Sequence, residues 1–172
     1  MPSAYPTQAF KTGGGRLPAL LTGSLPLRDA GGAMSQENVE IYRQAIGAFN
    51  RHDFEAWLEH FDRTITWWAM THEPEPGPFQ GHEGVSKMAA RWLDLLPDLR
   101  VEVKEYIDAG EYLVVPVRIC GRAPDSDADV VGEEVLLNKY RDGKIVEVRE
   151  YRTREEALEA VGLSEQDAHG DS

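Results

Sequence analysis

Hydrophobic residues recur at helical spacing in three stretches of the N-terminal half of the chain. Ser35 can cap a first helix that extends to about Asn50, and Asp53 can cap a second helix whose apolar residues continue to Phe61. A third apolar face covers residues 81–96. We therefore predict three N-terminal amphipathic helices, each with one face in the core.

Strands are expected where β-branched and aromatic residues gather, over residues 64–70, 99–107, 112–121 and 133–151. The last run should fold into a hairpin at Asp142-Gly143, because a type I′ turn needs positive φ at both central residues. With this hairpin, the three later runs give an antiparallel meander of four strands. Pro116 lies inside the meander and has no N–H to donate, so we expect a bulge or a locally unpaired edge there.

The C-terminal part of the chain joins the last strand to a short helix. Strict alternation after the turn places Val146, Val148 and Glu150 on one face, so that a carboxylate follows two valines into the apolar side. Thr153 then begins a capping-box pattern, and Gly162 can end the helix that follows.

Three helices followed by a four-stranded meander predict an α+β fold, with the helices packed on one concave face of a curved antiparallel sheet. The domain is expected to span residues 34–164. Residues 1–33 are rich in Gly, Pro and Ala and lack periodicity, so we interpret them as a disordered tail or the product of a start codon set too early. Residues 165–172 are expected to form a disordered C-terminal tail.

Charge and missing motifs argue against several classes of function. The formal net charge of −12 repels phosphate backbones and anionic lipids, which disfavours nucleic acids and membrane surfaces as partners. No apolar run reaches the length of about 18 residues that a membrane span needs, and a cytoplasmic location is expected. The lone Cys120 excludes an internal disulfide framework, the five histidines lack metal spacing, and no nucleotide-binding motif is present. We expect neither a metal nor a cofactor.

The remaining candidate chemistry is a set of aromatic residues with a few polar groups among them. Such aromatic residues usually form core, but their number makes an apolar cavity a second interpretation. The residues expected to line this cavity are Tyr42, Ile46, Phe49, Trp67, Trp92, Leu136 and Asn138. A carboxylate in the cavity would have a raised pKa, because burial disfavours its charged form.

Glu150 is the first candidate for this carboxylate, and Glu134 is a weaker one. The alternative for Glu150 is an ion pair with a nearby arginine, or exposure at the end of the strand. His72 follows the first strand, where a loop could cover the mouth of a pocket, and a surface histidine is its alternative. If Glu150 moves a proton, Tyr140 or His72 would donate a hydrogen bond to the developing oxyanion.

Five short motifs follow one another at a consistent spacing. They are Asn50-Arg51-His52-Asp53-Phe54, Ile65-Thr66-Trp67, Phe79-Gln80-Gly81-His82-Glu83-Gly84-Val85, Arg141-Asp142-Gly143-Lys144-Ile145 and Tyr151-Arg152-Thr153-Arg154-Glu155-Glu156-Ala157-Leu158. In this order, over residues 35–164, they resemble a SnoaL-like domain of the NTF2-like superfamily, of the type common in actinobacteria.

The resemblance implies a cone-shaped α+β barrel around a deep apolar pocket, often dimerising through the outer face of the sheet. Relatives of this kind include polyketide cyclases, a ketosteroid isomerase, dehydratases and an epoxide hydrolase, none of which needs a metal or an organic cofactor, beside binding modules without catalysis. Glu150 resembles an acid/base residue of such relatives in its position, whereas Leu136 occupies a position where similar sequences can carry a polar residue or His.

We therefore expect a homodimeric protein that takes an apolar small molecule into its pocket. Its expected activity is that of an acid/base enzyme, such as an isomerase, cyclase or dehydratase, on an apolar carbonyl-bearing or cyclic substrate. The alternative is a ligand-binding or dimerisation module without catalysis.

Overall fold

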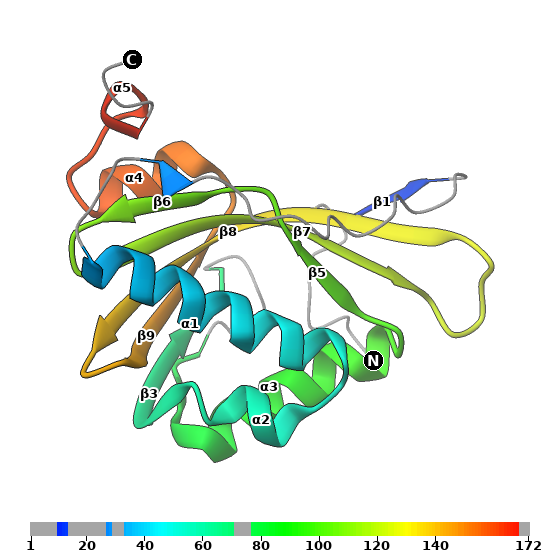
Figure 1. Cartoon of the computed structure of the whole chain (residues 1–172). Helices are drawn as coiled ribbons and strands as arrows, with labels where there is room; N and C mark the ends of the chain where they lie inside the picture. Colours follow the sequence, from blue (N-terminus) through cyan, green and yellow to red (C-terminus); the bar gives the residue numbers. More distant parts are fainter. Residues whose placement is uncertain (1–9, 14–26, 29–32, 71–76, 169–172) are drawn as a thin grey trace.

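The computed structural model describes residues 10–13, 27–28, 33–70 and 77–168 (Figure 1). It confirms the predicted α+β architecture: the N-terminal helices lie against the concave face of a curved sheet, and the C-terminal helices pack on the opposite face. Among the described residues there are five helices, one more than predicted, and the order of the strands does not close into a ring.

The helices on the concave face are α1 (Ala33–Asn50), α2 (Phe54–Leu58) and α3 (Gly81–Leu95). Asp53 caps α2 as predicted, because its carboxylate accepts a hydrogen bond from the Ala56 N–H at 3.2 Å. The prediction that α2 continues to Phe61 is wrong. Phe61 begins strand β3 (Phe61–Trp68) and pairs with Ile145, so tertiary pairing overrides the local helical pattern.

The later strands are β4 (Phe79–Gln80), β5 (Arg100–Val103), β6 (Tyr106–Ala109), β7 (Tyr112–Arg122), β8 (Asp129–Arg141) and β9 (Lys144–Tyr151). Strand β2 (Leu27–Arg28) begins the sheet, whose order is β2-β6-β7-β8-β9-β3-β4, and β5 also pairs with β7. Because β3 runs parallel to β9, the sheet is mixed and not wholly antiparallel as predicted. The first strand of the domain thus lies beside the last, and the chain between them includes α3 and the meander.

Two short strands lie in the N-terminal region that the sequence analysis assigned to a tail. β1 (Phe10–Gly13) pairs antiparallel with β8, and β2 (Leu27–Arg28) pairs parallel with β6. The rest of that region, up to residue 32, lies outside the described residues.

Pro116 explains why residues 99–107 form two strands, where one was predicted. The ladder between β7 and β8 continues through the pair Pro116 and Val135. On the other side of β7, β5 ends at Val103 and β6 begins at Tyr106, and the Lys104 N–H donates to the Pro116 carbonyl at 2.9 Å. The N and C=O of a strand residue point to the same side, so the missing N–H of Pro116 faces this break. The prediction of a locally unpaired edge is confirmed.

The hairpin between β8 and β9 has the predicted turn and an additional bulge. Asp142 and Gly143 have φ of 52° and 73°, as a type I′ turn requires. The register then shifts: Tyr140 pairs with Ile145, whereas Lys139 pairs with Glu147. The extra residue, Val146, therefore lies in a β-bulge, and the buried Ile145 takes the place on the concave face that alternation assigned to Val146.

Two short helices, α4 (Arg154–Ala160) and α5 (Glu165–Ala168), cover one end of the convex face. The Thr153 hydroxyl caps α4 by accepting the Glu156 N–H, and Gly162 follows the helix with φ of 75°, as predicted. α5 occupies residues that the sequence analysis assigned to a tail, and residues 169–172 lie outside the description. Pairing of two copies through the outer face stays a prediction. No helix among the described residues is long and apolar enough to span a bilayer.

Candidate functional site

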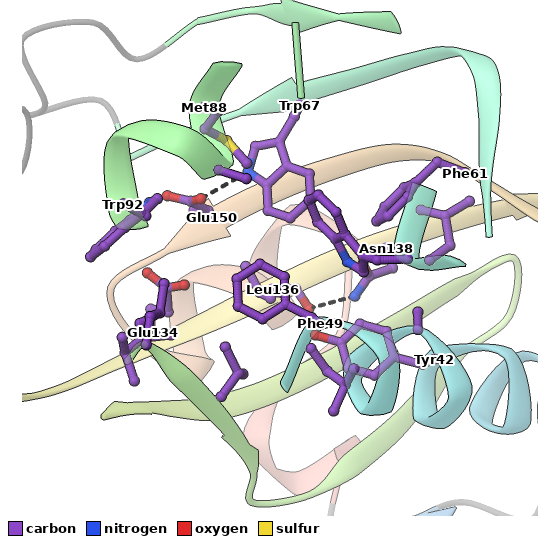
Figure 2. Close-up of a pocket in the computed structure, with 18 residues that line it drawn as sticks. Tyr42, Phe49, Phe61, Trp67, Met88, Trp92, Glu134, Leu136, Asn138 and Glu150 are labelled. Atoms are coloured by element: carbon purple, nitrogen blue, oxygen red, sulfur yellow. Dashed lines mark hydrogen bonds between the residues drawn. The ribbon is translucent and has the colours of Figure 1, made fainter. Parts of the chain in front are cut away.

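A cavity lies between the three N-terminal helices and the concave face of the sheet (Figure 2). The cavity has a volume of about 60 Å³. Most of the lining is apolar or aromatic. The structure brings together on it all seven residues that the sequence predicted there: Tyr42, Ile46, Phe49, Trp67, Trp92, Leu136 and Asn138.

Glu150 also lines the cavity, near the end of β9, with only 7% of its surface exposed. Its Oε1 accepts a hydrogen bond of 2.8 Å from the Trp67 indole Nε1–H, whereas Oε2 is buried and has no hydrogen-bond partner in the described ranges. Glu150 forms no ion pair there either; the neighbouring Arg149 pairs with Glu147 at 2.6 Å. The structure thus favours the cavity interpretation of Glu150 over the ion pair.

Burial raises the pKa of Glu150 to about 7, from an ordinary value of 4.5. Hydrogen bonding from Trp67 and the influence of the Met70 backbone lower this pKa, but the loss of hydration outweighs both. A carboxyl group with a pKa near 7 is populated in both its acid and its base form at neutral pH. It can therefore take a proton or give one without a metal.

Strand pairing determines what lies next to Glu150. Leu136 on β8 is its direct partner in the register, so the two side chains share the concave face. Trp67 pairs with Val148 on the other side of β9, and its indole reaches Glu150 two residues further along that strand. Glu134, which also lines the cavity and is 8% exposed, precedes Leu136 by two residues and lies on the same face.

An aromatic wall surrounds the cavity, with Trp57 of α2 at its centre. The Trp57 ring centroid lies 5.2 Å from Phe49, 5.0 Å from Phe61 and 6.2 Å from Trp67, and each ring pair is edge-to-face. The sequence pattern did not assign Phe61 to this wall, and it placed Phe61 on a helix instead of on β3. It likewise missed Ile145, which lines the cavity because of the bulge.

Tyr42 and Asn138 give the cavity a second polar side, away from the two carboxylates (Figure 2). The Tyr42 hydroxyl is buried and has no hydrogen-bond partner among the described residues. Burial raises its pKa well above the ordinary value, so the phenol stays protonated and can donate. The Asn138 amide donates to the carbonyls of Leu113 (3.3 Å) and Leu136 (3.2 Å), which fixes its orientation between β7 and β8.

Tyr140 and His72 are two further candidates from the sequence. Tyr140 is buried in the same core, near Tyr106, but it is not among the residues that line the cavity. His72 falls in the segment 71–76, outside the described residues. Their proposed roles stay predictions. In the described ranges, no group of three His, Cys, Asp or Glu side chains converges as metal ligands would.

Comparison with known proteins agrees with this architecture. The family model described as SnoaL-like domain matches residues 42–148, which confirms the resemblance found in the sequence. No curated protein matches the chain.

Several solved structures share the fold. TerC, co-crystallised with polyporic acid, is 20% identical with a TM-score of 0.60, over 73% of this chain and 98% of TerC. A Catenulispora acidiphila protein with a ketosteroid isomerase-like fold, in complex with trimethylamine, is 18% identical with a TM-score of 0.58, over 72% and 93%. A putative polyketide cyclase from Sinorhizobium meliloti is 18% identical with a TM-score of 0.55, over 68% and 98%. At these identities the likeness establishes the fold alone.

Proposed function

This chain belongs to the SnoaL-like family, and we propose that it is a cofactor-independent acid/base enzyme acting on an apolar carbonyl-bearing or cyclic small molecule. The observation that carries the proposal is the Glu150 carboxyl group. It is buried in an apolar cavity, has one oxygen held by Trp67 and the other without a partner, and has a pKa of about 7.

In the proposed reaction, Glu150 Oε2 removes a proton from the carbon beside a carbonyl group. The C–H electron pair moves into the enolate, whose oxygen carries the developing negative charge. Tyr42 donates a hydrogen bond to this oxygen, since its hydroxyl has no partner among the described residues. Returning the proton to another atom of the substrate gives isomerisation. Adding the enolate carbon to a second carbonyl group of the substrate forms a C–C bond and an alkoxide, and transfer of the proton from Glu150 to this alkoxide completes cyclisation.

Both the aromatic wall and Trp67 support this chemistry. The wall excludes water, which would otherwise solvate the carboxylate and return its pKa toward the ordinary value. The Trp67 indole holds Oε1, so that Oε2 keeps one orientation in the cavity. Pre-orientation of this kind reduces the reorganisation needed when the proton moves.

Proton exchange at carbon gives a direct test that needs no knowledge of the product. Small cyclic ketones incubated with the protein in D₂O should take up deuterium beside the carbonyl, measured by NMR. Glu150→Gln should slow this uptake by about 10²-fold or more, because a general base contributes on that order, while ketone binding remains largely intact. Glu159→Gln, the same exchange at an exposed position of α4, serves as the matched control. Equal uptake in the Glu150→Gln variant and the wild type would contradict the proposal.

The alternative is a ligand-binding module without catalysis. The small free volume of about 60 Å³ favours it, because side chains already fill much of the space between helices and sheet. In that case ketones bind but wild-type protein catalyses no deuterium uptake.

A further inference from the structure

The cavity is small for a protein that binds a carbon skeleton. Its 60 Å³ would hold a few water molecules, and a cavity of about 150 Å³ lined by leucine, isoleucine and phenylalanine takes a single benzene ring. Modest side-chain movement can therefore admit one ring, whereas a fused two-ring ligand would have to displace large buried side chains. Displacing them is unfavourable, because the edge-to-face cluster around Trp57 is closely packed.

Leu136 lines this cavity next to Glu150. It is paired directly with Glu150, a relationship that places two Cβ atoms about 4.5–5.5 Å apart. It also lies between Glu134 and Asn138 along β8, on the same concave face. In Figure 2, Leu136 lies between the Glu150 carboxyl group and the Tyr42 hydroxyl, so a ligand that contacts both groups would lie beside its side chain.

The two unpartnered polar atoms define the chemistry of the ligand. The Tyr42 phenol keeps its proton, so it can donate a hydrogen bond to an acceptor such as a carbonyl oxygen. Glu150 Oε2 needs a group that can exchange a proton with it. Most of the lining between them is apolar, with Glu134 and Asn138 as the other polar residues, so the body of the ligand should be mainly hydrocarbon.

We propose that the cavity selects carbonyl compounds of no more than one ring, and that Leu136 is the specificity-determining residue that sets this limit beside Glu150. The inference rests on the proposed function for the role of Glu150, but the size limit is a property of binding and can be measured without turnover. The size limit assigns the substrate class, which is open-chain or monocyclic ketones and enones. Fused polycyclic ketones are excluded.

Binding can be followed at the Trp67 indole N–H signal in ¹H–¹⁵N NMR, because this group lies on the cavity wall and touches Glu150. The probes are cyclohex-2-enone and its fused two-ring analogue, an octalone. Wild-type protein should bind the one-ring enone at least roughly tenfold more tightly, since a hydrophobic pocket discriminates by about 10- to 200-fold for small steric differences. Leu136→Ala should lower this preference for the one-ring enone by roughly tenfold, so that the two probes bind equally well or the octalone binds more tightly.

Leu137→Ala is the matched control, because Leu137 is equally buried on the same strand but faces α4 on the convex side. It should leave the ratio unchanged. Leu136→Val, which removes less volume, should give an intermediate ratio and provides a second variant if Leu136→Ala does not fold. Equal binding of both probes by the wild type, no binding of the one-ring enone, or a wild-type ratio in both Leu136 variants would each overturn the inference. The proposed function fails separately, if the enone binds but Glu150→Gln leaves deuterium uptake unchanged.

Discussion

The Trp67 indole Nε1–H donates a 2.8 Å hydrogen bond to the Glu150 carboxylate across the parallel strands β3 and β9, joining residues 83 positions apart. The bond fixes one oxygen of a buried carboxyl group and leaves the other in an apolar cavity. It also favours the charged form, against the larger effect of burial. The balance between burial, which raises the pKa of Glu150, and hydrogen bonding, which lowers it, controls the protonation of the site.

Stability should depend on pH through Glu150. Its pKa is about 7 in the folded protein and about 4.5 ordinarily, so between these values the folded state binds the proton more tightly than the unfolded state does. The contribution of Glu150 to the free energy of unfolding, roughly 3 kcal/mol, is therefore complete below pH 4.5 and is lost as the pH rises through 7. Glu150→Gln removes this dependence, so it should be more stable than the wild type at pH 8 and differ least at pH 4.5.

Urea unfolding of both proteins across this pH range would measure the difference in the free energy of unfolding. Glu159→Gln, at an exposed position, should follow the wild-type curve. A constant difference between Glu150→Gln and wild type at all pH values would contradict this prediction, because it would show that Glu150 has the same pKa in the folded and the unfolded state.

Trp67→Phe should raise the pKa of Glu150 further above 7. The substitution removes the donor that favours the carboxylate, and hydrogen bonds to charged groups contribute enough to move a pKa by about one pH unit. Carboxyl-carbon NMR titration would measure the change. Trp57→Phe changes the same aromatic wall without touching this bond and serves as the control for altered packing. An unchanged or lower pKa in Trp67→Phe alone would contradict the role of the bond.

Tyr42→Phe should leave the unliganded protein as stable as the wild type, or up to about 1 kcal/mol more stable, because the hydroxyl it removes is buried and unpaired in the described structure. The same variant should lower ketone affinity and deuterium uptake. Tyr140→Phe removes a second buried hydroxyl without a partner in the described structure, on a residue that does not line the cavity. Comparing the two variants therefore separates the loss of a ligand contact from a change in the core. If only Tyr140→Phe lowers uptake, Tyr140 is the oxyanion donor.

Gly143→Ala should lower the free energy of unfolding by about 1 kcal/mol, since Gly143 has φ of 73° and an L side chain is strained there. Asp142→Asn is the control, because Asn accepts positive φ at this turn position. Thermal and urea unfolding would measure both variants. Equal stability of Gly143→Ala and wild type would mean that the turn can adopt another type without loss.

Local sequence was sufficient for the elements whose geometry depends on neighbouring residues. The cap at Asp53, the cap at Thr153 and the turn at Asp142-Gly143 each follow from side-chain and backbone preferences within a few positions, and the structure has all three. Periodicity likewise identified the helix face that carries Tyr42 into the cavity. The order of elements was enough to predict an α+β fold with helices on the concave face.

Tertiary structure decided the features that depend on pairing between distant segments. Phe61 joins a strand because β9 offers it a partner, and the bulge at Val146 turns Ile145 inward, although neither event has a signal in the local pattern. The sequence suggested Glu150 as a cavity acid or an ion-paired glutamate, and only the placement of Trp67 beside it, with no cation paired to it in the described ranges, distinguished the two. Its pKa follows from the hydration lost in that surrounding, a quantity that no stretch of sequence contains by itself.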